Sequence, residues 1–244
     1  MTANPKAVAH FQNYQSRKSV LPDFRSSGLL AKWPIIGLTM FIFGSLMFGA
    51  LTFNLLAQGP LLVWDRALAN MLPAIILKSS TLIQYFMNIG FYIGNEVIIV
   101  LVILHALYFW YKRYWQELAM LTIGTVGGGL LFQFLSRLIA RPRPPTQMGI
   151  IIHGNLSGFP SGHAIAVITF YGLLAYLLTP KMRSVFWKVI VIATALLIIG
   201  FVGFSRIVTG GHYLTDVLAG YAVGIAWSGM AYTLIEIYFQ KRKS

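Results

Sequence analysis

The 244-residue chain contains no cysteine, and only six of its residues are acidic. The absence of cysteine excludes disulfides and thiolate metal sites, and it carries no information about the redox compartment. Because the few acids are scattered, the sequence offers no compact carboxylate cluster for Mg²⁺. We therefore expect neither a metal nor another cofactor. Charged residues make up 10% of the chain, against about 25% in a typical water-soluble domain.

Hydrophobic residues, by contrast, make up 57% of the chain, and they occur in long runs. A helix of about 20 apolar residues crosses the hydrocarbon core of a bilayer. The first run is too long for a signal peptide and follows a polar tail. We expect an all-α polytopic membrane protein with six transmembrane helices, a tail at residues 1–33, a membrane domain at 34–240 and a basic C-terminus at 241–244. The expected spans are centred on Pro34–Ala57, Ile89–Tyr111, Leu118–Ser136, Ala164–Thr179, Val189–Ser205 and Val217–Ile235.

A formal net charge of +13 would suit a nucleic-acid partner, but the distribution of the cations favours a membrane. If six helices alternate, 13 of the 19 Lys and Arg residues fall on one side, in the tail, two turns and the C-terminus. The positive-inside rule makes that side the cytoplasm. We therefore predict a multi-pass plasma-membrane protein with both termini cytoplasmic. The sequence indicates no nucleic-acid partner and leaves the oligomeric state open.

The segment from Ser205 to Asp216 carries the clearest chemical pattern. Gly-Gly can end one helix, and His212 can open the next, which places Asp216 on the same helix face. A carboxylate there can hold one imidazole nitrogen and aim the other at a substrate. Arg206 adds a permanent cation that suits a phosphate oxygen. The alternative is a helix-surface pair without a chemical role.

Two further polar segments fall on the same predicted extracytoplasmic side. The first ends the third helix with Arg137, Arg141 and Arg143, and its prolines stop the helix. The second is Pro-Ser-Gly-His at 160–163, where Ser161 can cap the fourth helix. Free N–H groups at a helix start attract anions, and Gly162 permits close approach. The alternatives are a basic loop at the membrane boundary and an ordinary serine cap.

The three segments together resemble the type 2 phosphatidic acid phosphatase family of integral membrane lipid phosphatases. The family pattern is a lysine followed seven residues later by Arg-Pro, then Pro-Ser-Gly-His, then Ser-Arg, five residues, His, three residues and Asp. The chain matches the second and third motifs in full, and Arg143-Pro144 matches the first. Ser136 stands where the family usually has lysine. Either Arg137 or Arg141 supplies the missing cation, or the phosphate site has one contact fewer.

The resemblance implies a mechanism without a metal. His212 attacks phosphorus to form a phosphohistidine, and Asp216 orients His212. His163 protonates the leaving oxygen and then activates water. The expected phosphate-binding residues are Arg143, Arg206, Ser161, Gly162, Arg137 and Arg141.

The first-choice substrate is undecaprenyl pyrophosphate. Phosphatidic acid or phosphatidylglycerophosphate hydrolysis is the alternative, and a phosphotransferase would use the same residues. A phospholipid transporter or scramblase is the alternative from another class, but it gives no reason to pair His212 with Asp216. The partners in the leading interpretation are a phosphorylated membrane lipid and the bilayer.

Other polar residues allow weaker interpretations. Glu96, in the outer half of the second helix, is within possible reach of the arginines, and an acid inside a membrane span is often functional. His105 is interpreted as a histidine of the helix bundle, and His153 as a loop histidine that either contacts substrate or is solvated. Residues 58–88 form either a helix in the membrane interface, with Trp64 as an anchor, or an ordinary packed connector.

Overall fold

A computed structural model describes residues 27–145 and 157–242 of the chain. Within these ranges every regular element is a helix, and six helical segments are long and apolar enough to cross a membrane. The six-span all-α prediction is therefore confirmed. The spans are Pro34–Leu56, Thr81–Tyr111, Trp115–Ile139, Gly162–Lys181, Val185–Val208 and Leu214–Lys241. The division at residues 33 and 240 stays a prediction, and His153 lies outside the described residues.

The last helix, α11 (Leu214–Lys241), lies at the centre of the bundle. In its most apolar window 67% of residues are buried, against 11% in α10 (Val185–Val208). It packs against α3 (Pro34–Leu56) and α9 (Gly162–Leu178). A side chain at Gly44 of α3 would lie only 2.5 Å from a backbone oxygen of α11. Such close contact is how helices associate in a bilayer, so the start of α11 is held in a fixed place.

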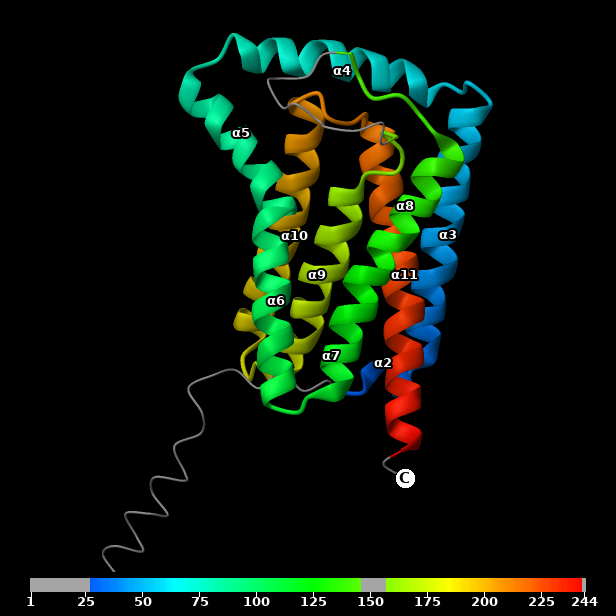
Figure 1. The fold of residues 1–244 in the computed structure, drawn as a ribbon, viewed down its shortest axis with the longest axis vertical. Helices are drawn as coiled ribbons and strands as arrows, with labels where there is room; N and C mark the ends of the chain where they lie inside the picture. Colours follow the sequence, from blue (N-terminus) through cyan, green and yellow to red (C-terminus); the bar gives the residue numbers. More distant parts are fainter. Residues whose placement is uncertain (1–26, 146–156, 243–244) are drawn as a thin grey trace, which may run out of the picture.

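The second span is broken at Asn95. It consists of α5 (Thr81–Gly94) and α6 (Glu96–Tyr111), and Asn95 between them has non-helical backbone angles. Figure 1 shows α5 sloping away from the line of α6. The carboxylate of Glu96 is exposed at the start of α6 and accepts a hydrogen bond from Asn95. The span begins at Thr81, earlier than the predicted Ile89, because the apolar run is preceded by residues that also fit a helix.

The third span contains a π-helical turn, η1 (Ile123–Gly127), between α7 (Trp115–Thr122) and α8 (Gly128–Ile139). The indole of Trp227 donates hydrogen bonds to the carbonyls of Ile123 and Gly124, at 3.0 and 3.2 Å. A side chain at Gly124 would collide with Tyr232 of α11. Glycine at position 124 therefore permits close contact between this span and α11.

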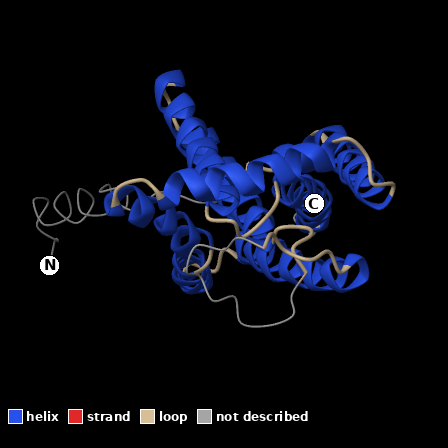
Figure 2. Cartoon of the chain, turned by 90° about the horizontal axis from the view of Figure 1, so that it is seen from above, coloured by secondary structure: helices blue, strands red, loops and turns tan. Residues whose placement is uncertain are grey.

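The connector between the first two spans contains α4 (Leu61–Leu77), which lies across one end of the bundle (Figures 1 and 2). Trp64 is exposed on this helix, whereas Asp65 is buried. The connector is thus a helix with one exposed apolar face and one packed face. Short helices α2 (Leu29–Lys32) and η2 (Thr179–Lys181) lie at the opposite end of the bundle, where α2 packs against α11 and η2 packs against α9 and α10.

Candidate active site

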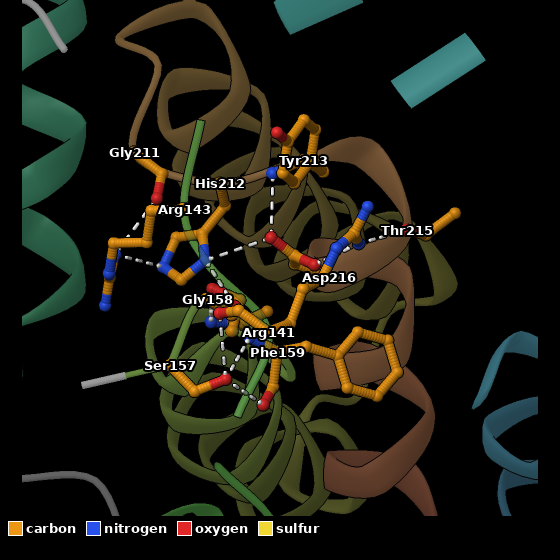
Figure 3. Close-up of polar contacts among 12 residues, drawn as sticks. Arg141, Arg143, Ser157, Gly158, Phe159, Gly211, His212, Tyr213, Thr215 and Asp216 are labelled. Atoms are coloured by element: carbon orange, nitrogen blue, oxygen red, sulfur yellow. Dashed lines mark hydrogen bonds and ion pairs between the residues drawn. The ribbon is translucent and has the colours of Figure 1, made fainter. Parts of the chain in front are cut away.

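The three predicted polar segments meet beneath α4. They come from the loop after α8, the start of α9, the end of α10 and the start of α11 (Figure 3). The segments are separated by up to about 75 positions in the chain, as the Arg141–Asp216 contact shows. The fold therefore brings together residues that the sequence could only assign to the same side.

His212 lies in the loop before α11. The helix begins at Leu214, so His212 precedes it by two residues and does not open it as expected. The reason is the tight turn at Gly210, whose φ of 71° favours glycine. The N–H groups of Gly211 and His212 both donate to the carbonyl of Arg206, which closes this turn. His212 is consequently fixed and only 1% exposed.

The contacts of the His212 ring define its tautomer. Nδ1 lies 2.8 Å from the carbonyl oxygen of Gly158, and Nε2 lies 3.2 Å from Nη1 of Arg143. A carbonyl can only accept and a guanidinium can only donate. Nδ1 therefore carries the proton, and the lone pair of Nε2 faces Arg143.

The electrostatic surroundings keep this ring neutral. Burial lowers the pKa of His212 well below 6.5, and the positive charges of Arg143 and Arg206 lower it further. The hydrogen bond to Gly158 acts in the opposite direction but does not outweigh them. A neutral imidazole with an available lone pair is the form that can act as a nucleophile.

Asp216 is beside His212 but does not make the shortest contact to it. Its Oδ2 is 3.6 Å from Nδ1 of His212, which is within ion-pair range, and it accepts a 2.8 Å hydrogen bond from the N–H of Tyr213. Oδ1 accepts from Arg141. The Gly158 carbonyl thus orients the uncharged ring, and Asp216 is placed to balance a positive charge on it.

A cavity of about 330 Å³ opens beside the two histidines. Its lining combines polar groups from the predicted motifs with apolar groups from the second, third and fourth spans. The lining residues are Gly94, Asn95, Thr125, Gly129, Phe132, Arg143, Gly162, His163, Ile165, Ala166 and His212. None of these is acidic, so the cavity suits an anion.

Arg143 forms part of the cavity wall. Its Nη1 donates to the carbonyl of Gly211 at 2.9 Å as well as facing His212. Burial lowers the pKa of Arg143 below its ordinary value, and the charge of Asp216 partly offsets this shift. An arginine remains protonated even so, because its ordinary pKa is far above neutrality.

Arg206 and His163 present buried side-chain nitrogens that lack a hydrogen-bond partner in the described part of the chain. Arg206 is 1% exposed, and its guanidinium carbon lies 4.9 Å from the ring centre of Phe91. Among the described residues, Nε and Nη1 of Arg206 and Nε2 of His163 have no hydrogen-bond partner. The rings of His163 and His212 are 6.4 Å apart. Buried donors left unpaired are costly, so this arrangement favours an anionic ligand.

Ser161 and Gly162 have different positions at the start of α9. The predicted cap is confirmed, because Ser161 Oγ accepts from the N–H of Ala164 at 3.5 Å. Ser161 is fully buried and does not line the cavity. Gly162 does line it, and a side chain there would press on the ring of Phe132 at 3.3 Å. The helix start therefore faces the cavity through Gly162.

The structure does not bring Arg137 and Arg141 to the cavity. Arg137 is exposed in the last turn of α8. Arg141 is buried on the far side of Asp216, where its guanidinium donates to Asp216, Asp65 and Thr215. Ser136 is buried and its hydroxyl donates to the carbonyl of Gln133. The predicted phosphate contacts of the two arginines do not fit this geometry, because the charge of Arg141 is already committed to two carboxylates.

Asp65 is a polar residue of this region that the sequence analysis missed. It lies on α4, is 1% exposed, and accepts hydrogen bonds from the N–H and hydroxyl of Thr215 and from Arg141. A signal was present: Leu62, Asp65 and Ala69 share one helix face, and the other two are apolar core residues. An acid on an otherwise apolar face indicates a buried partner.

The arrangement as a whole has the groups needed to bind and attack a phosphoryl group. One cavity is lined by the neutral imidazole of His212, the imidazole of His163 and the guanidinium of Arg143, and the buried guanidinium of Arg206 lies nearby. In the part of the chain that the structure describes, no group of three His, Asp or Glu side chains is placed to hold a metal. Guanidinium groups can neutralise a phosphoryl group directly.

Comparison with known proteins agrees with this chemistry. Phosphatidylglycerophosphatase B of Bacillus subtilis (strain 168) is 34% identical over 130 residues, which cover 52% of this chain and 61% of that protein. Lipid A 1-phosphatase of Rhizobium johnstonii is 35% identical over 125 residues, covering 48% and 47%. The chain thus spans less than two thirds of the length of these relatives.

The fold has a close counterpart among solved structures. The crystal structure of a transmembrane PAP2-type phosphatidylglycerolphosphate phosphatase from Bacillus subtilis matches 84% of this chain and 96% of its own, with a TM-score of 0.64 and 25% identity. The sequence pattern of the PAP2 superfamily matches residues 117–239, which is half of the chain and includes all residues around the cavity except Gly94 and Asn95. The chain belongs to the PAP2 superfamily.

Proposed function

We propose that the protein is a membrane-embedded lipid phosphatase that works through a phosphohistidine on His212. The observation that carries this proposal is the His212 ring itself. Its proton is held on Nδ1 by Gly158, and its Nε2 lone pair faces Arg143 at the cavity. This is a nucleophile prepared beside an anion site.

In the first step the phosphoryl oxygens accept hydrogen bonds from Arg143 and Arg206. This pairs the buried donors of Arg206 and draws Arg143 away from Nε2. Nε2 of His212 attacks phosphorus, and the bond from phosphorus to the ester oxygen breaks. His163 gives its proton to the leaving oxygen, and the phosphate charge favours the protonated form of His163 beforehand.

In the second step water removes the phosphoryl group. The His212 ring is now positively charged, and the carboxylate of Asp216, 3.6 Å from Nδ1, balances that charge. The neutral His163 accepts a proton from water as its oxygen attacks phosphorus. The P–Nε2 bond breaks, phosphate leaves, and both histidines return to their starting forms.

The substrate in this proposal is a phosphate ester of a membrane lipid, with phosphatidylglycerophosphate first. The sequence alone placed undecaprenyl pyrophosphate first. The names of the relatives in Bacillus subtilis move phosphatidylglycerophosphate ahead of it. The cavity lies at one end of the spans, where a head group in water and a tail in lipid can be held together. With the plasma membrane as its location, the site faces the extracytoplasmic side.

The test is phosphate release by the purified protein in detergent. We expect release from phosphatidylglycerophosphate to exceed that from phosphatidic acid and undecaprenyl pyrophosphate, and to persist in the presence of EDTA. His212→Ala should abolish release, whereas Arg137→Gln, which changes an exposed cation, should not. Normal turnover by the His212→Ala protein would overturn the proposal. Complete loss of activity with EDTA would overturn the metal-independent mechanism.

A further inference from the structure

Behind the cavity, α4 and the start of α11 are joined by a buried network of charged groups. Arg141 donates through Nη2 to Asp65 at 2.8 Å and through Nη1 to both Thr215 and Asp216. Asp65 also accepts the backbone N–H of Thr215 at 2.9 Å and its hydroxyl. Figure 3 shows the guanidinium of Arg141 and the side chain of Thr215 on the side of Asp216 that faces away from Arg143.

The members of the network are held firmly and do not line the cavity. Asp65, Thr215 and Asp216 are at most 3% exposed, and Arg141 is 8% exposed. The guanidinium carbon of Arg141 also lies 4.2 Å from the ring centre of Tyr213. Four different contacts thus define the position of one guanidinium. Because none of these side chains lines the cavity, the network acts on the chemistry only through Asp216 and the neighbouring backbone.

The charges explain why Asp65 matters to Asp216. A single guanidinium is shared between two carboxylates, and each takes a different nitrogen. Among the described residues, Asp65 is the one that accepts a hydrogen bond from Nη2 of Arg141. Without this carboxylate, the guanidinium could rotate toward Asp216 alone. Arg141 is also two residues before Arg143, so its position sets the backbone from which Arg143 reaches His212.

We propose that Asp65 is a positioning residue for the reaction, acting through Arg141 and Thr215 to fix Asp216 beside His212. This inference rests on the proposed function, in which His212 is the nucleophile. It makes α4 part of the catalytic apparatus. The helix that lies across the bundle supplies the carboxylate that anchors the first turn of α11.

The test compares Asp65→Asn with the matched control Arg66→Gln, which changes the exposed neighbour on the same helix. We expect Asp65→Asn to lower kcat roughly 10- to 100-fold, because small displacements of reacting groups have effects of this size. KM should change less than about twofold, because the network does not contact the phosphate. The control should retain the kcat and KM of the unaltered protein.

A double-mutant cycle separates positioning from general loss of structure. Because Asp65 acts in part through Arg141, the combined effect of Asp65→Asn and Arg141→Gln should be smaller than the sum of their separate effects. Thr215→Val, which keeps the side-chain shape and removes the hydroxyl, should lower kcat in the same way and serves if Asp65→Asn does not fold. Additive effects, or a rise in KM with kcat unchanged, would overturn the inference. Activity retained by His212→Ala would instead refute the proposed function itself.

Discussion

The charge state of His212 decides whether its imidazole can act as the nucleophile. Burial and two arginines lower its pKa well below 6.5. At pH 6.0 an ordinary histidine with a pKa of about 6.5 is roughly three quarters protonated. We predict that His212 remains neutral at that pH, with its proton on Nδ1. Nitrogen NMR of histidine-labelled protein, assigned with the His212→Ala variant, measures both properties.

The same shift has a consequence for stability. Because the folded pKa is below the unfolded one, the unfolded chain binds the proton first as the pH falls below about 6.5. His212 therefore adds no pH dependence above that value and destabilises the fold increasingly below it. A protonated His212 at pH 6.0 would contradict both statements.

Arg143 and Arg206, which lie near His212, should contribute to activity, whereas the exposed Arg137 should not. Each phosphate hydrogen bond from a charged group contributes about 1.5–3 kcal/mol, so Arg143→Gln and Arg206→Gln should each lower kcat/KM by roughly 10- to 150-fold. Arg137→Gln is the matched control and should have no effect, since its side chain is exposed at the end of α8. Phosphate-release kinetics measure all three variants. A larger loss for Arg137→Gln than for Arg143→Gln would reverse the assignment.

The residues of the motifs were predictable from their spacing, but the division of labour among the arginines was not. Arg141 and Arg143 have nearly identical local sequence, each followed by proline. Only the fold shows that one faces His212 and the other faces Asp65, because the difference depends on a helix about 75 positions earlier in the chain. For the same reason the sequence could not show that Gly158 orients the His212 ring.

At the scale of helices, the break between α5 and α6 shapes the cavity wall. Gly94 ends α5 there, and a methyl group on it would lie 2.7 Å from Val202 and 3.0 Å from Cδ2 of His163. We predict that Gly94→Ala displaces His163 and lowers kcat several-fold. Gly200→Ala on α10 is the control, because a methyl group there meets no heavy atom of another element within 4 Å. Equal kinetics for the two variants would show that the close packing at Gly94 does not position His163.

The spans themselves follow from the apolar runs, because a segment in lipid must satisfy its backbone hydrogen bonds internally and so becomes a helix. The interruptions do not follow from the runs. Asn95 breaks the second span without a proline, and η1 turns within an uncharged segment. Both depend on contacts with other helices: Gly90 packs on Ser205, and Trp227 binds the carbonyls of η1. Such contacts are decided by the fold and leave little trace in local composition.

For the molecule as a whole, the two ends of the helix bundle differ in their charge and in the groups that they carry. The end that carries α2, η2 and the last turn of α11 also carries Lys112, Lys181 and Lys241. The opposite end carries α4 and the cavity. The positive-inside rule predicts that the first end faces the cytoplasm. This orientation would place phosphate release outside, where water and the lipid head group meet the site.

Because the chain contains no cysteine, single cysteines can report this orientation without background. Ser80, at the start of α5, and Ser184, at the start of α10, are both exposed and lie at opposite ends. In spheroplasts, a membrane-impermeant maleimide should label Ser80→Cys directly and Ser184→Cys only after permeabilisation. Both variants should retain phosphate release, which confirms that they are folded. Labelling in the reverse order would place the catalytic end in the cytoplasm and would require a substrate pool in the inner leaflet.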